Sequence, residues 1–140
     1  MATINATVTI GSDIISGVSI SNTMTMTKAG TNNGLDGTTG LNVKTVQTET
    51  AFKLFGNAEA TTLKASKVYI RNTGSSATDF FYIGFGEDLA AATIETIGRL
   101  YGNDWMLIPW DAVAATTHDI YAKSSTAESA MTLEFIAFTE

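Results

Sequence analysis

Few side chains in this sequence have the chemistry of a catalytic or metal-binding site. The chain has one histidine, His118, and no cysteine. A multi-histidine zinc site, a thiolate nucleophile and a disulfide framework are therefore excluded. His118 could act as the base of a serine triad, but no Gly-x-Ser-x-Gly elbow accompanies it. A single histidine beside Asp119 is more usual at a surface or an interface, so we expect no catalytic residue, no cofactor and no metal ion.

Acidic residues are the other possible source of chemistry. A glycosidase needs two carboxylates about 5 to 10 Å apart across a cleft, and a sequence does not fix that separation. Solvated acids in turns explain nearly all the candidates better than a functional pair does. The candidates are Glu87, Asp88, Asp104, Asp111, Asp119, Glu128 and Glu134.

The segment 29–40 is rich in glycine and asparagine. Its Asn-Gly and Asp-Gly pairs supply the positive-φ positions that tight turns need, and no Gly-Lys-Ser/Thr follows, as a phosphate loop would require. Asn32, Asn33 and Asp36 offer oxygen ligands for calcium but lack the spacing of a calcium-binding loop. We expect a turn or a contact-making loop, and whether it binds an ion or a partner stays open.

Three aromatic residues gather near one predicted turn: Tyr101, Trp105 and Trp110. Exposed coplanar rings would suit sugar stacking, so a carbohydrate-binding module is one alternative. The segment 105–110 places apolar side chains on both of its faces, which favours a strand covered by a second sheet or by a neighbouring subunit. We expect the three rings to be interface anchors, because tryptophan and tyrosine are enriched at interface hot spots.

Charge and hydropathy exclude two classes of partner. The formal net charge is −6, and the 8 Lys and Arg residues are scattered singly, so the basic face that nucleic-acid binding requires is not predicted. No window reaches about 18 uninterrupted apolar residues, so we expect no membrane span. The first ten residues alternate polar with apolar side chains and do not resemble a signal peptide.

Alternation with a period of two predicts strands along the whole sequence. The pattern indicates one all-β domain over residues 1–140, a single antiparallel β-sandwich of jelly-roll type with about eight or more short strands. Strands are expected at 2–10, 14–20, 23–28, 41–55 (as one or two), 66–72, 79–86, 96–100, 105–110, 119–123 and 131–138. Strands 66–72 and 79–86 are predicted to pair as a hairpin.

Residues 1–28 are Thr-rich and weakly hydrophobic, and they predict an edge or arm at an oligomer interface. Within them, 14–20 and 23–28 are expected to be separate strands joined through Ser21 and Asn22. Met24 and Met26, two residues apart, should then point inward together, and both are interface candidates.

The second half, residues 66–138, carries an ordered succession of motifs. They are Lys67-Val68-Tyr69-Ile70-Arg71-Asn72-Thr73, Phe81-Tyr82-Ile83-Gly84, Ile97-Gly98-Arg99-Leu100-Tyr101-Gly102-Asn103-Asp104-Trp105-Met106-Leu107-Ile108-Pro109, Ile120-Tyr121-Ala122-Lys123 and Leu133-Glu134-Phe135-Ile136. In this order they resemble small virion proteins of tailed bacteriophages. Gly-Asn-Asp stands here where the corner of that pattern usually has Gly-Glu.

This resemblance implies a non-enzymatic structural protein of the virion, made in the host cytoplasm. Its first expectation is a capsid decoration (cement) protein that binds the head lattice as a homo-oligomer, with the major capsid protein as its partner. The alternative is a neck, tail or fibre-associated module whose partners are neck or tail proteins. The resemblance implies no catalytic residue.

Overall fold

The computed structural model describes residues 3–56, 66–86, 96–111, 118–126 and 129–140. The protein is all-β, as expected, and its strands are antiparallel. The described residues form eleven strands: β1 (Asn5–Gly11), β2 (Ser19–Thr25), β3 (Gly37–Thr38), β4 (Asn42–Val46), β5 (Phe52–Phe55), β6 (Ser66–Asn72), β7 (Phe80–Phe85), β8 (Thr96–Tyr101), β9 (Trp105–Pro109), β10 (Ile120–Ser124) and β11 (Met131–Thr139).

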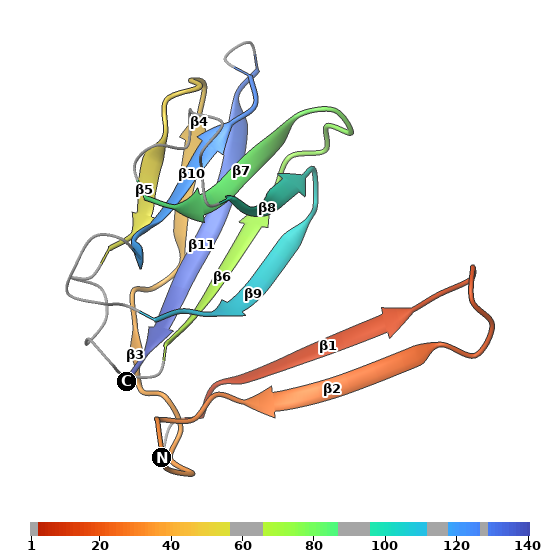
Figure 1. Cartoon of the computed structure of the whole chain (residues 1–140), viewed down its shortest axis with the longest axis vertical. Helices are drawn as coiled ribbons and strands as arrows, with labels where there is room; N and C mark the ends of the chain where they lie inside the picture. Colours follow the sequence, from red (N-terminus) through yellow and green to blue (C-terminus); the bar gives the residue numbers. More distant parts are fainter. Residues whose placement is uncertain (1–2, 57–65, 87–95, 112–117, 127–128) are drawn as a thin grey trace.

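Two of the three sheets face each other and form a sandwich (Figure 1). One is four-stranded, in the order β5-β10-β7-β8. The other is five-stranded, in the order β3-β11-β6-β9, with β4 beside β3 on the same edge of β11. Consecutive strands from β4 to β11 lie in different sheets, except for β7 and β8, which pair as a hairpin in the four-stranded sheet. This is the strand order of a jelly roll, which confirms the predicted fold class.

The strands of the sandwich form where apolar residues recur at every second position. In β11 these residues, Met131, Leu133, Phe135 and Ala137, are buried while those between them are partly exposed. Side chains from both sheets meet in one core. The ring of Phe55 packs against two others in that core, with centroids 5.8 Å from Trp110 and 5.5 Å from Phe135.

The predicted hairpin of strands 66–72 and 79–86 is wrong, although both strands exist. The first, β6, pairs with β11 and β9, whereas the second, β7, pairs with β10 and β8. The turn between them crosses from one sheet to the other. A turn signal fixes where a strand ends, but in a jelly roll it does not fix the partner.

A tight corner joins β8 to β9. Asn103 has a positive φ of 69°, and its amide donates to the carbonyl of Asn72 at 3.0 Å. The side-chain amide of Asn72, which is buried, donates to the carbonyl of Leu100 at 3.0 Å. Gly102 lies so close to the backbone of Ser76 that a Cβ there would be 2.6 Å from its carbonyl oxygen. The corner is therefore fixed by backbone contacts and by the side chain of Asn72.

The third sheet is a hairpin of β1 and β2, which corrects the predicted strands near the N-terminus. One strand, β2, runs through Ser21 and Asn22, and residues 12–18 form the connecting loop. The hydroxyl of Ser12 accepts the amides of Ile14 and Ile15 and shapes that loop. The predicted turn at residues 21–22 failed because small polar residues also suit an exposed strand.

Candidate functional site

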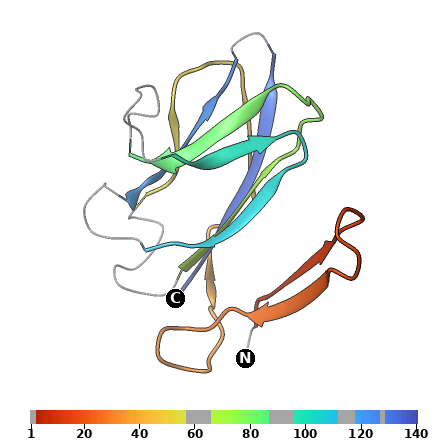
Figure 2. The ribbon, with the colours of Figure 1, turned by 45° about the vertical axis from the view of Figure 1, so that its right-hand side comes forward.

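The hairpin of β1 and β2, called the arm below (residues 5–25), stands apart from the sandwich (Figures 1 and 2). The core cluster includes none of its residues. The strand register separates its side chains into two faces. One face is apolar and consists of Ala6, Val8, Ile10, Ile20 and Met24, with Asn22 opposite Val8 as its polar member.

The opposite face of the arm is polar, and its side chains bond to one another across the strands. Each such bond satisfies a hydroxyl group without water, which lowers the cost of covering this face. The pairs are Thr7 Oγ1 with Thr23 Oγ1 at 2.8 Å, Thr25 Oγ1 donating to Asn5 Oδ1 at 2.8 Å, and Thr9 Oγ1 with Ser21 Oγ at 3.3 Å.

The tip of the arm is apolar and open to solvent. Ile14 is 91% exposed, and its neighbour Ile15 is also exposed. Between Asn5 and Thr25 the only charged side chain is Asp13. A projecting segment with large apolar side chains and a single charge is typical of a surface that another molecule covers.

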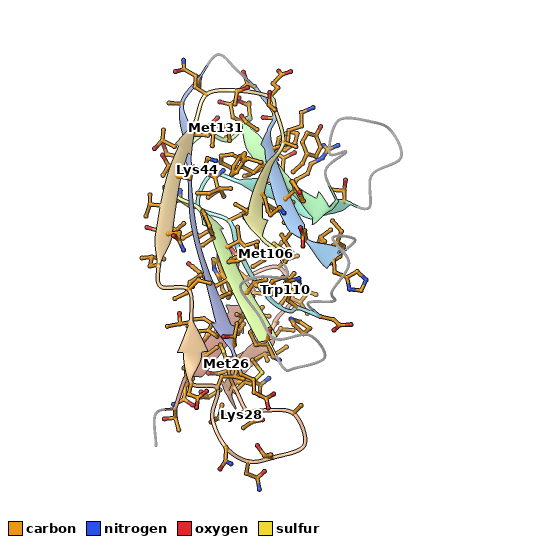
Figure 3. All side chains as sticks on the ribbon, turned by 90° about the vertical axis from the view of Figure 1, so that its left-hand side faces the viewer. Met26, Lys28, Lys44, Met106, Trp110 and Met131 are labelled. Carbon is orange, nitrogen blue, oxygen red and sulfur yellow. The ribbon has the colours of Figure 1, made fainter. Side chains whose placement is uncertain are left out.

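The root of the arm is closed by buried residues and backbone hydrogen bonds of segment 4–35. Met26 is 2% exposed and Leu35 is fully buried, and Figure 3 shows Met26 near the root of the arm. The Met26 amide donates to the carbonyl of Ile4 at 2.9 Å, and its carbonyl accepts the Leu35 amide at 2.8 Å. The prediction that Met24 and Met26 point inward together is therefore wrong. Strand β2 ends between them at Thr25, so Met24 stays on the exposed arm and Met26 is buried beyond it.

The glycine-rich loop 29–40 closes this root. A bridge pairs Thr27 with Gly34, and Lys28 Nζ lies 2.8 Å from Asp36 Oδ2. The hydrogen bond from Lys28 holds the pKa of Asp36 below its usual value. Asp36, one of the possible calcium ligands, thus already pairs with a lysine, and the loop has a structural role in anchoring the arm.

An open cleft of about 510 Å³ separates the arm from the outer face of the five-stranded sheet. One wall is the base of the arm. The other wall belongs to β6, β9 and the corner before β9. The residues that line the cleft are Ala6, Thr7 and Val8 on the arm, and Tyr69, Arg71, Asn103, Trp105 and Leu107 on the sheet.

The sheet wall of this cleft combines an apolar row with the polar side chains of Arg71 and Asn103. The rings of Tyr69 and Trp105 lie side by side with centroids 6.2 Å apart, and Trp105 is 48% exposed. Leu107 pairs with Tyr69, which pairs with Ile136 of β11, so an apolar row crosses three strands. In the next row the guanidinium of Arg71 lies 3.9 Å from the carboxylate of Glu134, which balances its charge.

The three predicted interface rings lie in three different places. Trp105 lines the cleft, whereas Tyr101 packs against Phe80 on the four-stranded sheet with centroids 5.0 Å apart. Trp110 is 4% exposed in the core (Figure 3), and its indole N–H donates to the carbonyl of His118 at 2.8 Å. Trp110 is thus a core residue rather than a surface anchor. The platform of coplanar rings that a sugar would need is not assembled from these residues.

The candidate chemical residues have structural partners. His118 Nδ1 lies 2.9 Å from the carbonyl of Asp111. The carboxylate of Asp119, which is buried, lies 2.7 Å from Lys53 Nζ, and this hydrogen bond raises the pKa of Lys53. Asp104 Oδ2 accepts the amide of Tyr101 at 2.9 Å in the corner. Glu87, Asp88 and Glu128 lie outside the described residues.

The described ranges contain no group of three or more histidine, cysteine, aspartate or glutamate side chains that could hold a metal ion. They also contain no helix that is long and apolar enough to cross a membrane.

Sequence inspection missed two parts of this site. The isoleucines at the tip, Ile14 and Ile15, were assigned to a strand, although Ser12 and Gly17 around them are loop residues. The sequence predicts strands that contain Tyr69 and Leu107, but it does not indicate that these two side chains lie on the outer face of a sheet. The near-absence of charge in the arm, which has only Asp13, could have identified the first, because an exposed ribbon normally carries more charged side chains.

Comparisons of the chain with protein-family models, with curated proteins and with solved structures gave no match.

Proposed function

We propose that this chain is a non-enzymatic structural protein of a tailed-phage particle, a capsid decoration protein that binds the head lattice as a homo-oligomer. The observation that carries the proposal is the arm, whose apolar face and isoleucine tip lie open to solvent. A two-stranded ribbon is at best marginally stable in water without a surface to pack on. The arm therefore needs a macromolecular partner.

The cleft beside the arm supports a protein partner over a small ligand. Ligand pockets enclose most of their ligand and present converging polar groups. This cleft is open, its sheet wall carries Tyr69, Trp105 and Leu107, and its cation, Arg71, already faces Glu134. An exposed tryptophan and a partly buried tyrosine on an apolar surface are instead what protein interfaces use.

The assignment to a virion rests on the ordered motifs of residues 66–138 and on the physics of repeated contacts. Many copies docked on one lattice gain affinity through effective concentration, so modest contacts by each copy suffice. A net charge of −6 keeps copies that cover an outer surface soluble.

The test begins with light scattering on the purified protein and continues with co-sedimentation on particles that lack it. We expect a defined homo-oligomer that pellets with heads in a fixed ratio. The test variant is the double substitution Ile14→Ser and Ile15→Ser, which changes only the tip of the arm and should weaken self-association or binding to heads. Binding to tails alone would move the role to a tail module, and a monomer that binds neither would overturn the proposal.

A further inference from the structure

We infer that the arm of one copy docks on the outer face of the five-stranded sheet of a second copy, with its apolar face against Tyr69, Trp105 and Leu107. This inference rests on the homo-oligomer of the proposed function and names the surface that receives the arm. The arm and its receiving surface are both present on every chain, so identical copies supply both halves of the contact.

Much of the apolar face of the arm is not covered by the rest of the chain. Ile10, Ile20 and Met24 on its apolar face remain exposed. An isolated hairpin gains independent stability only from a third strand or from packing against another surface. Met26 and Leu35 are buried at the root of the arm, whereas the outer part of its apolar face has no cover.

The receiving surface is also left partly exposed within one chain. Trp105 is half exposed, and the row formed by Leu107, Tyr69 and Ile136 is only partly buried. Trp105 and Tyr69 are residue types that dominate interface energies when they become desolvated. The charges of Arg71 and Glu134 on this surface pair with each other, so covering the surface would not leave either charge unpaired.

The five-stranded sheet of the same chain shares a cleft with only the base of the arm. The cleft is lined by Ala6, Thr7 and Val8, whereas Ile10 and Ile20 lie beyond its lining. In Figure 1 the arm runs away from the sandwich, so that its tip lies apart from β9. Because the root is fixed by buried residues, the outer half of the arm is presented to another molecule and the cleft stays open to receive one.

The length of the arm sets the surface area that such a contact would bury. The strands of the arm have seven residues each, so an arm is about 24 Å long and each of its faces covers about 240 Å². A reciprocal exchange of two arms onto two receiving faces then buries about 1,000 Å², which is the least area expected of a biological interface. The polar face adds little cost, since its hydroxyls are already paired across the strands.

The absence of cysteine from the chain makes a site-specific test possible. Two single variants are prepared in the full chain, Ile20→Cys on the arm and Leu107→Cys on the receiving sheet, one of them isotope-labelled. The two are mixed, allowed to exchange subunits, and treated with a short bismaleimide. The control replaces Leu107→Cys with Thr96→Cys, an exposed position on β8 of the other sheet.

We expect a covalent product of one labelled and one unlabelled chain with Leu107→Cys, and little of it with Thr96→Cys. The double variant Ile20→Cys/Leu107→Cys, measured alone, tests the alternative arrangement in which the arm contacts the sheet of its own chain. If cross-linking leaves it at the mass of one chain, the arm folds onto its own sheet and the inference is overturned. An intact oligomer without the mixed product also overturns it while leaving the proposed homo-oligomer standing, whereas a monomer at all concentrations removes both.

A second measurement does not depend on reactive thiols. Trp105→Ala should weaken self-association by about thirty-fold, the effect of a hot-spot residue. Ile97→Ala, which truncates an exposed residue of the four-stranded sheet, should leave self-association unchanged. Thermal unfolding of both variants establishes that they remain folded. Equal self-association of the Trp105→Ala variant and the wild type would contradict the inference.

Discussion

The arm and the sandwich are built from the same alternation of side chains, yet only one of them is covered. Along β11, Leu133 and its inward neighbours are buried by the opposite sheet. Along β1 and β2 the equivalent face, with Ile10 and Ile20, is open. Alternation therefore defines two faces in either region, and the second layer decides whether the apolar face stabilises the fold or remains available for binding.

The largest difference between the two regions should appear when an apolar side chain is truncated in each. Phe55→Ala removes a core ring that contacts Trp110 and Phe135, and we expect the free energy of unfolding to fall by about 3–5 kcal/mol. Ile20→Ala on the arm should change it by less than about 0.5 kcal/mol. Denaturant unfolding of the monomer measures both, and a comparable loss at Ile20 would show that the arm folds with the core.

A second contrast concerns the corner of the sandwich beside the cleft. Gly102→Ala would place a methyl group against the backbone of Ser75 and Ser76, so we expect a loss of about 1–3 kcal/mol from steric strain. Gly98→Ala, on the adjoining β8, meets no atom within 4 Å and serves as the control. Equal stabilities of the two variants would mean that the corner can move.

A third contrast is the response to alkaline pH. The pKa of Lys53 is raised by the Asp119 carboxylate, so the pair stabilises the fold fully below the ordinary pKa of a lysine. That contribution is lost as the pH rises through the raised pKa. We expect Lys53→Met to be less stable than the wild type at neutral pH, with the difference vanishing at high pH.

The control for this pH series is Lys67→Met, because Lys67 Nζ contacts a backbone carbonyl, that of Ser66 at 3.4 Å, instead of a buried carboxylate. Its stability difference from the wild type should not follow the same pH profile. A pH-independent deficit in the Lys53→Met variant would exclude the ion pair as its cause.

The smallest expected effect compares two threonine pairs with nearly equal geometry. Thr7 pairs with Thr23 at 2.8 Å in the arm, and Thr45 pairs with Thr132 at 2.9 Å in the sandwich. Each cross-strand pair contributes a few tenths of a kcal/mol. Thr45→Val should lower the global free energy of unfolding, whereas Thr7→Val should only speed hydrogen exchange in the arm.

This exchange experiment also separates the two regions by their opening. If Thr7→Val altered global unfolding as much as Thr45→Val does, the arm would be part of the cooperative sandwich. Local opening of the arm, with an unchanged sandwich, is the result expected of a segment that packs only at its root.

The individual strands were largely predictable, because burial on one face imposes a period of two on the sequence. Residues 66–72 and 131–138 illustrate this, since Val68, Ile70 and Leu133 all point to the core as expected. The end of β9 at Pro109, on an edge of the sheet, also follows from local chemistry, because proline has no amide to donate.

The pairing of those strands was not predictable. Strands β6 and β7 are consecutive and joined by turn residues, yet they lie in different sheets. Trp110 and Trp105 belong to one segment with apolar residues on both faces, but one ring is in the core and the other borders the cleft. Local sequence does not record which of two apolar faces another layer will cover.

By itself, the sequence determined which segments are extended, which side chains share a face and that the arm is almost without charge. Those properties depend on backbone geometry and composition, which act between neighbours along the chain. Only the tertiary structure decided that β4 to β11 close as a jelly roll, that Met26 anchors the arm while Met24 stays exposed, and that the arm faces an apolar sheet across an open cleft. These depend on contacts between residues far apart in the chain, where the packing of whole layers outweighs local preference.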